Sequence, residues 1–245
     1  MKRYVIDILG YREGNVIGLR DATFATFRSV FGTEQNFDEG KLAQWIRPGK
    51  SDVIVFYSGH GVAGLEDQSG YLLPVDGDAS RAETTGYSID LLYKNLSKIK
   101  ARSVTVFLDT CFSGQSPNGY LIKGASGLTV TAKEAIVPTK MTVLTAAQND
   151  QVANWDDDAK HGMFTEYLLR ALYGAADGKD FGNGNGEVSL AEVRVYLEEE
   201  MSYQARRQFG RKQTATFNGS DETVLAFSED GKFPDRPELE FSSFS

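Results

Sequence analysis

Apolar residues along the chain follow two patterns, continuous runs and a repeat of three to four positions. The continuous runs at 52–58, 103–109 and 141–147 are rich in β-branched residues, which is typical of strands buried on both faces of a parallel sheet. The shorter segments 15–19 and 222–227 have the same character. We therefore predict five strands.

The helical repeat marks the segments between these strands. It covers residues 21–32, 41–46, 88–100, 162–174 and 189–207. Asp21 is a candidate N-cap and Gly32 a candidate C-cap for the first of these helices. Ser189 and Glu192 have the spacing of a capping box at the start of the last one.

Four segments carry weaker patterns. Residues 2–9 fit either the end of a helix or a short strand, and residues 70–80 are extended before a turn. Residues 113–139 are rich in Gly, Ser, Thr and Pro, which indicates a long surface loop. The tail from Ser228 is polar, and we expect it to be poorly ordered.

Strands that alternate with helices predict an α/β fold, a three-layer sandwich with a mostly parallel sheet between helices. Functional groups in such sheets gather at the carboxyl ends of the strands. The chain has one cysteine and two histidines, and Cys111 and His60 each lie two residues after the end of a predicted strand. We therefore expect both side chains on the same rim of the sheet.

Composition limits the classes of function. The 245 residues carry a net charge of −8 without a Lys/Arg run, which argues against a nucleic-acid surface. The apolar runs are too short to span a bilayer, and no signal peptide opens the sequence, so we expect no membrane association. A single cysteine cannot form an internal disulfide, which fits a reducing, cytoplasmic compartment.

A thiol beside an imidazole is a nucleophile beside a base. Cys111 would attack a carbonyl carbon, and the backbone N–H groups of Gly61 and Cys111 would stabilise the oxyanion. Taken singly, a cysteine is more often a small buried hydrophobe, and a histidine more often has no catalytic role. The shared position at strand ends favours catalysis, whereas His161 is interpreted as a capping or solvated residue.

The two motifs resemble those of a known family. "YSGHG" (57–61) and "DTCFSG" (109–114) are similar to the histidine and cysteine motifs of caspase-like peptidases of family C14, closest to metacaspases and their bacterial relatives, the orthocaspases. The caspase histidine precedes the cysteine by about fifty residues, and the spacing between His60 and Cys111 matches this. The resemblance implies a cysteine endopeptidase with Cys111 as nucleophile and His60 as general acid/base.

The resemblance also implies a domain layout. It predicts one catalytic domain over 1–228, followed by a polar tail at 229–245. Within the domain, 1–112 resembles the large subunit, 113–140 the linker and 141–228 the small subunit. The family's fold normally opens with a strand before the segment at 15–19. That strand is either "YVIDIL" (4–9) or missing, in which case an N-terminal segment or an activating protein would complete the sheet.

Acidic residues near the rim indicate which side chain the substrate carries at the cut site. Caspases bind aspartate through arginine, but here the residue after Trp155 is Asp156. Asp109 and Asp76 also end strands or loops near the rim, and Ser58 ends the strand before His60. Carboxylates pair with a guanidinium through charge-assisted hydrogen bonds, so we expect protein or peptide substrates cut after Arg or Lys.

We expect no required cofactor and no metal at the catalytic site. Calcium is an activator of many metacaspases, and Asp156, Asp157 and Asp158 are the candidate ligands by resemblance. "DGKDFGNGNGEVSLAE" (177–192) has part of an EF-hand pattern, but Phe181 stands at its first ligand position, so a Gly/Asn turn is preferred.

The linker contains basic residues at which such an enzyme could cut itself, namely Lys123, Lys133 and Lys140. Two other functions compete with peptidase activity. A catalytically idle caspase-like interaction module would keep the fold without the chemistry. A flavodoxin-like ligand binder is less favoured, because no glycine-rich phosphate loop follows the first strand.

Overall fold

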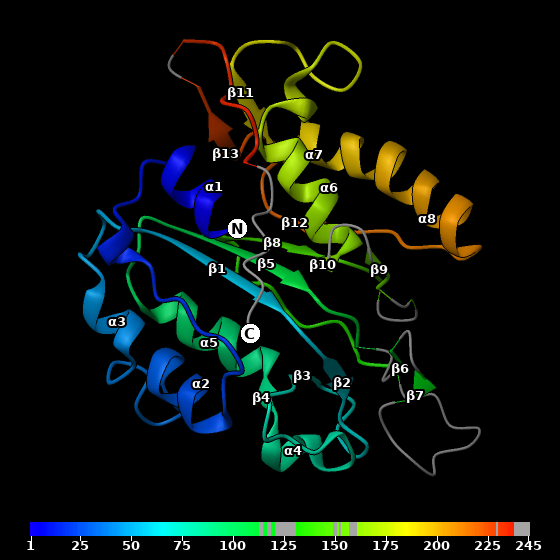
Figure 1. Ribbon diagram of the computed structural model, residues 1–245. Coiled ribbons are helices and arrows are strands. Elements are labelled where there is room, and N and C mark those ends of the chain that lie inside the picture. The colour runs from blue at the N-terminus through cyan, green and yellow to red at the C-terminus, as the bar shows by residue number, and fades with distance from the viewer. Residues whose placement is uncertain are drawn as a thin grey trace, which may run out of the picture. The chain divides into compact units, whose positions relative to one another are not determined.

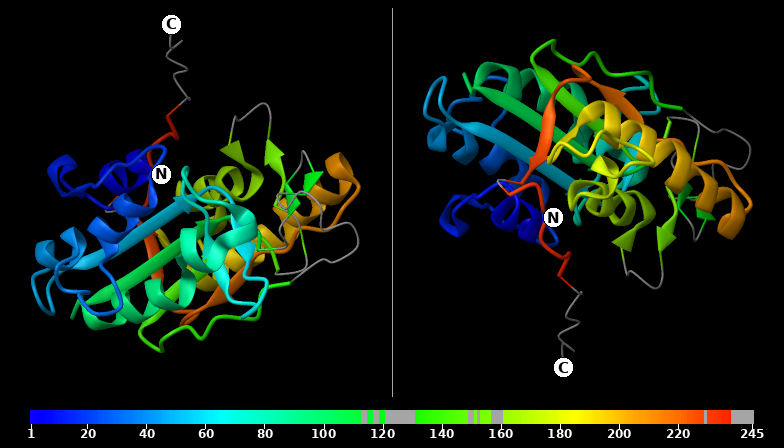
Figure 2. Two further views of the ribbon diagram at one scale, coloured as in Figure 1. Left: turned by 90° about the horizontal axis from the view of Figure 1, so that it is seen from below. Right: turned by 90° about the horizontal axis from the view of Figure 1, so that it is seen from above.

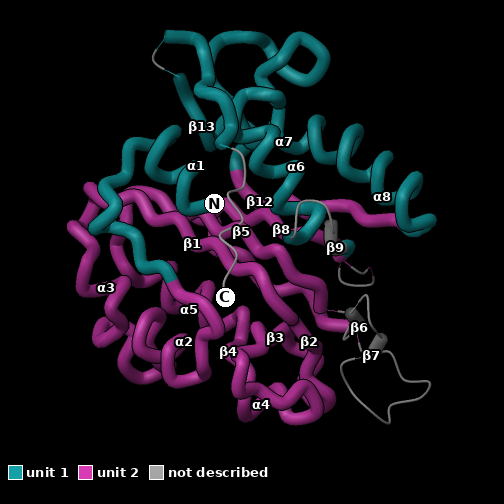
Figure 3. Tube along the Cα trace, in the orientation of Figure 1, with its two compact units in different colours: residues 1–18, 154–211, 220–245 teal, residues 19–153, 212–219 magenta. Residues whose placement is uncertain are grey.

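A computed structural model describes residues 1–112, 115–116, 119–120, 131–148, 151, 153–156, 161–228 and 230–237. The chain divides into two compact units (Figure 3). Unit 1 comprises residues 1–18, 154–211 and 220–245, and unit 2 comprises residues 19–153 and 212–219. Among the described residues, no helix combines the length and hydrophobicity that a membrane crossing requires.

Unit 2 is built on a four-stranded sheet (Figure 1). Its order is β1 (Asp52–Ser58), β5 (Ser103–Asp109), β8 (Met141–Thr145) and β12 (Thr216–Asn218). The first three strands are parallel, and β12 is antiparallel to β8. The mostly parallel sheet predicted from the alternation is therefore confirmed, and β1 forms one of its edges.

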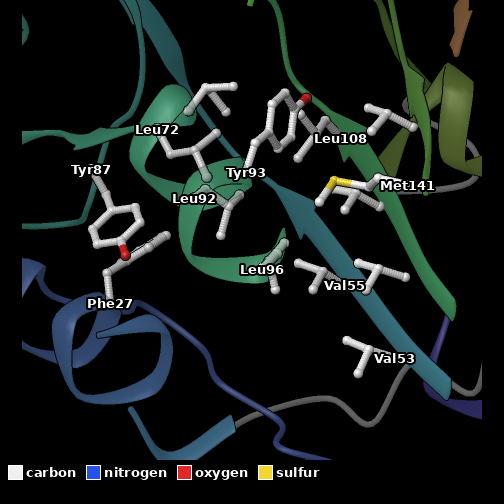
Figure 4. Packing of buried hydrophobic residues seen from close by; sticks show 14 of the residues in the cluster. Phe27, Val53, Val55, Leu72, Tyr87, Leu92, Tyr93, Leu96, Leu108 and Met141 are labelled. Atoms are coloured by element: carbon white, nitrogen blue, oxygen red, sulfur yellow. The ribbon is translucent and has the colours of Figure 1, made fainter. Parts of the chain in front are cut away.

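Helices α2 (Phe24–Phe31), α3 (Lys41–Trp45) and α5 (Ile89–Lys98) pack together on one face of this sheet (left view of Figure 2). Leu92 and Leu96 of α5 face Val55 of β1 in a close-packed layer (Figure 4). Leu92 is fully buried. Burial of an aliphatic side chain of this size contributes about 2 kcal/mol, so this layer fixes β1 and β5 as a rigid platform.

Three short strands form a second, antiparallel sheet in unit 2. They are β2 (Gly61–Ala63), β3 (Gly70–Leu72) and β4 (Tyr87–Ser88), and their order is β2-β3-β4. The 3₁₀ helix η2 (Ala79–Arg81) and α4 (Ala82–Thr85) connect β3 to β4. The linker region contains the strand pair β6 (Gln115–Ser116) and β7 (Gly119–Tyr120).

Unit 1 contains the remaining helices of the described chain. These are α1 (Lys2–Asp7), η1 (Glu13–Asn15), α6 (Met163–Leu172), η3 (Ala175–Asp177), α7 (Leu190–Tyr196), a π-helical turn η4 (Leu197–Met201) and α8 (Ser202–Phe209). Two strand pairs accompany them, β9 (Trp155–Asp156) with β10 (His161–Gly162) and β11 (Glu187–Ser189) with β13 (Val224–Phe227). The buried Tyr4 hydroxyl donates to the Leu225 carbonyl, which ties α1 to β13.

Several predictions of local structure are confirmed. The bounds of β1 and β5 are the predicted ones, and Ser189 and Glu192 form the capping box. Gly32 caps α2 with φ 81°. Of the two alternatives for residues 2–9, the helix is observed and the strand is not.

Other predictions are wrong. Residues 16–19 form no strand, and Thr23, not Asp21, caps α2, because the Thr23 hydroxyl accepts the Thr26 N–H. The strand predicted at 222–227 is observed as β13, but among the described residues it pairs with β11 and not with the main sheet, which β12, missed by the sequence analysis, joins instead. The tail is held in place over residues 230–237.

Candidate active site

His60 and Cys111 lie at equivalent points beyond two neighbouring strands. Ser58, the last residue of β1, pairs with Asp109, the last residue of β5. His60 and Cys111 each follow two residues later. Since neighbouring strands lie about 4.8 Å apart, the parallel register brings the two motifs together at the carboxyl edge of the sheet.

The "YSGHG" segment is fixed by its own tyrosine. The Tyr57 hydroxyl donates to the His60 carbonyl at 2.8 Å, and burial raises the pKa of Tyr57, which keeps this donor protonated. A Cβ atom on Gly59 would lie 2.6 Å from the Tyr57 hydroxyl oxygen. A residue with a side chain at position 59 would therefore displace the Tyr57 ring from its present position.

Gly61 brings the histidine loop against the cysteine loop. A Cβ atom on Gly61 would lie 2.7 Å from the carbonyl oxygen of Cys111 and 2.7 Å from the Thr110 hydroxyl oxygen. The backbone directly after His60 is thus in contact with the backbone at Cys111. This contact, together with the strand register, brings the two candidate catalytic positions into one site within unit 2.

The direction of the Gly61 amide follows from the pairing of β2 with β3. Backbone hydrogen bonds join Leu73 N–H to His60 carbonyl and Gly64 N–H to Ser69 carbonyl. Gly61 lies opposite Leu72, at a position between these bonded pairs. In an antiparallel ladder such a residue directs its N–H away from the neighbouring strand, so the Gly61 amide points away from β3.

Exposure differs between the two candidates. His60 and Ser58 are exposed, and Cys111 is partly buried. Asp109 and Thr110, directly before the cysteine, are buried at 6% and 2% exposure. The imidazole is therefore open to an incoming chain, whereas the strand end that carries the thiol is anchored in the core.

Asp76 has an identified backbone partner. One oxygen of its exposed carboxylate accepts the N–H of Phe24, the first residue of α2, at 2.8 Å. It thus supplements the Thr23 cap at that helix end. A negative charge at a helix N-terminus is favourable, so this contact contributes to stability independently of any substrate.

Trp155 and Asp156 form strand β9 in unit 1, and their side chains are not described. Asp157 and Asp158 lie outside the described residues. The predicted roles of these four residues thus stay predictions. The other predicted site residues, Ser58, Asp109, Asp76 and Gly61, belong to unit 2 together with the catalytic pair.

Two residues of the site were missed by sequence reasoning. Tyr57 holds the His60 carbonyl, and the Thr110 hydroxyl lies 3.5 Å from the Cys111 carbonyl. Both belong to the quoted motifs, so the position of Tyr57 two residues before Gly59 and of Thr110 next to Cys111 was the signal that could have identified them.

The loop at 177–192 is organised by backbone contacts. The Asp177 carboxylate accepts the N–H groups of Asn185 and Gly186, and the Glu192 carboxylate accepts those of Asn183 and Ser189. Both acids are buried. Their oxygens thus stabilise a turn, as expected for the Gly/Asn alternative. In the described part of the chain, no group of three acidic, histidine or cysteine side chains is arranged to hold a metal ion.

Comparison with known proteins agrees with this geometry. A search among curated proteins found no match. A family model described as the caspase domain, peptidase C14, matches residues 33–225, a range that contains both motifs. The family's α/β sandwich with a mostly parallel central sheet is the predicted fold class. The chain belongs to the caspase domain family of cysteine-type peptidases.

Proposed function

We propose that this protein is a cysteine endopeptidase that cleaves peptide bonds after Arg or Lys. Cys111 is the nucleophile and His60 the general acid/base. The observation that carries the proposal is the pairing of Ser58 with Asp109, which places the two motifs side by side. Family membership supports peptidase activity in general.

The first step is attack of the Cys111 sulphur on the carbonyl carbon of the scissile bond. His60 takes the thiol proton, and the carbonyl π electrons move to oxygen. The oxyanion accepts hydrogen bonds from the backbone N–H groups of Gly61 and Cys111. The Gly61 amide suits this role, because its ladder position directs it away from β3.

The second step breaks the carbon–nitrogen bond. His60 gives its proton to the leaving amine, and a thioester remains on Cys111. Water then attacks the thioester with His60 as base, and the thiol and a carboxylic acid are regenerated. The exposed position of His60 gives both the amine and the water access.

Carboxylates would determine the preference for a basic side chain. Asp109 is the strongest candidate, because it is buried and directly precedes the Thr110–Cys111 segment. The electrostatic attraction between a guanidinium and a carboxylate is stronger when the carboxylate is buried than when it lies at the surface. Asp76, Asp156, Ser58 and Trp155 are further proposed contacts of the substrate.

Activation has three proposed routes. Exposed Lys133 and Lys140 are candidate sites of self-cleavage, whereas Lys123 lies outside the described residues. Calcium is a proposed activator through the acidic run at 156–158. An activating protein or N-terminal segment could add a strand to β1, which lies at a sheet edge.

Peptides with a fluorogenic leaving group test the proposal. Wild-type protein should hydrolyse peptides ending in Arg or Lys faster than one ending in Asp, with and without calcium. Cys111→Ala should abolish turnover, and His60→Ala should lower it by roughly 10³-fold or more. Asp109→Asn should raise KM more for the Arg peptide than for the other peptides. Preferred turnover of the Asp peptide would contradict the specificity.

A thiol-reactive peptide probe separates the peptidase from an idle interaction module. The chain has one cysteine, so labelling reports on Cys111 alone. A peptidase should label faster with an Arg probe than with an Asp probe, and His60→Ala should label slowly. Equal, slow labelling by all probes would favour the idle module.

A further inference from the structure

A buried carboxylate in unit 1 joins three segments of the chain. Glu166 lies in the first turn of α6, and its side chain is only 5% exposed. Arg236 donates to both its oxygens, at 2.8 and 2.6 Å, and Arg170 donates at 2.8 Å. His161 Nε2 lies 3.2 Å from the same carboxylate.

His161 links this carboxylate to the hairpin strands. It lies in β10, which pairs with β9 so that His161 faces Asp156 and Gly162 faces Trp155. The Asn154 carbonyl also accepts the N–H of Met163, the first residue of α6, at 2.9 Å. The backbone that carries Trp155 and Asp156 is therefore tied to the start of α6.

Arg236 links the carboxylate to the end of the chain. We call residues 230–237 the C-terminal strap. Phe233 packs against Gly174, where a Cβ atom would lie 2.4 Å from its ring, and Gly174 has φ +100°. The strap thus contacts α6 just beyond its C-terminal end and again in its first turn. It lies outside the range matched by the caspase family model, residues 33–225.

The charges in this cluster depend on one another. Burial alone would raise the pKa of Glu166, but the ion-pair contact with His161 and hydrogen bonds from Arg236 and Arg170 hold it well below its ordinary value. Burial lowers the pKa of His161, but the Glu166 carboxylate and the Gly162 carbonyl outweigh this and raise it. When His161 is protonated, it shares one buried anion with two guanidinium groups.

We propose that Arg236 is a positioning residue, and that the C-terminal strap holds Glu166 where its contact with His161 fixes the β9–β10 backbone. Fixing of the hairpin rests on the contacts within unit 1 alone. Its consequence for catalysis rests on the proposed function, in which Trp155 and Asp156 contact the substrate. Arg236 acts through Glu166 and His161 and touches no reacting atom.

Hydrogen–deuterium exchange of the full-length protein tests the proposal without any assay of activity. In Arg236→Ala, amides in peptides that cover residues 154–163 should exchange at least about tenfold faster than in wild type. Arg170→Ala is the matched control, because it removes a guanidinium from the same carboxylate but lies on α6 itself. It should leave exchange at the hairpin close to wild type.

Two results would overturn the positioning role. One is wild-type exchange at 154–163 in an Arg236→Ala protein that remains folded. The other is equal acceleration in Arg170→Ala, which would assign the effect to the charge of Glu166 alone. If Arg236→Ala does not fold, Arg236→Lys takes its place in the exchange experiment, with the same expected and contradicting results. A lysine keeps the charge but loses the two-pronged contact.

Kinetics provide the second readout. In Arg236→Ala, KM for the Arg peptide should rise by roughly tenfold, with kcat and the alkylation rate of Cys111 by a small reagent within about twofold of wild type. A fall in kcat without a change in KM would contradict positioning of the substrate. If wild type cleaves no peptide, the proposed function fails, while the exchange experiment still decides the role of the strap.

Discussion

The amide of Gly59 donates a hydrogen bond to the carbonyl oxygen of Asp109 at 3.2 Å. This bond continues the β1–β5 ladder one step past the end of β1. It holds the chain before His60 against the chain before Cys111. The geometry of the candidate pair is thus an extension of the sheet, and not a property of two independent loops.

Replacement of Gly61 should impair catalysis more than folding. In Gly61→Ala, the new Cβ atom would meet the Cys111 carbonyl and the Thr110 hydroxyl at 2.7 Å, so the two loops must separate. We expect a loss of about 1–3 kcal/mol in stability. We expect kcat/KM to fall by roughly 10²-fold. Thermal unfolding and peptide hydrolysis measure the two effects.

Gly18→Ala is the control for this substitution, since a Cβ atom there would have no neighbour within 4 Å. It should match wild type in both assays. Unchanged kcat/KM in a folded Gly61→Ala protein would refute the close contact.

Tyr57→Phe should loosen the histidine loop. It keeps the ring but removes the hydroxyl that donates to the His60 carbonyl. We expect about 1 kcal/mol of lost stability. We expect kcat to fall several-fold, measured with the Arg peptide. Tyr203, which is 55% exposed, offers the comparison, and Tyr203→Phe should change neither quantity. Equal kcat in the two variants would speak against a role for the Tyr57 hydroxyl.

Two variants of Asp76 separate its helix contact from a substrate contact. Asp76→Ala removes the acceptor for the Phe24 N–H and should cost about 1 kcal/mol in unfolding free energy. Asp76→Asn keeps an acceptor oxygen but removes the charge, so its stability should stay closer to that of wild type. If Asp76 also binds the substrate, Asp76→Asn should raise KM for the Arg peptide. If KM in Asp76→Asn equals that of wild type, the role of Asp76 is limited to its contact with the start of α2.

The stability supplied by His161 should depend on pH. Its pKa in the folded protein is raised above the ordinary value of 6.5, so its contribution is full below that value and is lost as pH rises through the folded pKa. Glu166 keeps its charge throughout, since its pKa is lowered. Arg170 and Arg236 also contact this carboxylate.

Denaturant unfolding of wild type and His161→Gln between about pH 5.5 and pH 9 measures this contribution. The stability advantage of wild type should shrink as pH rises. An advantage that is constant or grows with pH would contradict the ion pair with Glu166.

The sequence predicted the two strands that carry the site better than the side-chain contacts around it. The bounds of β1 and β5 were predicted because both strands are apolar on both faces, and the carboxyl-end rule then located His60 and Cys111. The caspase resemblance was confirmed over residues 33–225. Strand β12 was missed because three residues carry no readable period.

Long-range contacts were beyond reach from the sequence. The role of Tyr57 depends on a fold-back onto His60, and that of Asp76 on a helix start more than fifty residues away. His161 was interpreted as capping or solvated, and Arg236 as part of a poorly ordered tail. Their shared partner, Glu166, lies in a helical repeat that predicts burial but not the charges that converge on it.

The pairing of β1 with β5 also separates two kinds of spacing. The number of residues between His60 and Cys111 depends on the length of the segment that connects β1 to β5. Their separation in space depends on the register between these two strands. Residues 65–68 form an exposed turn, and insertions at exposed turns are well tolerated. Proteins of this design can therefore lengthen or shorten that connecting segment, or acquire new surface modules on it, while the distance across the rim remains that of two adjacent strands.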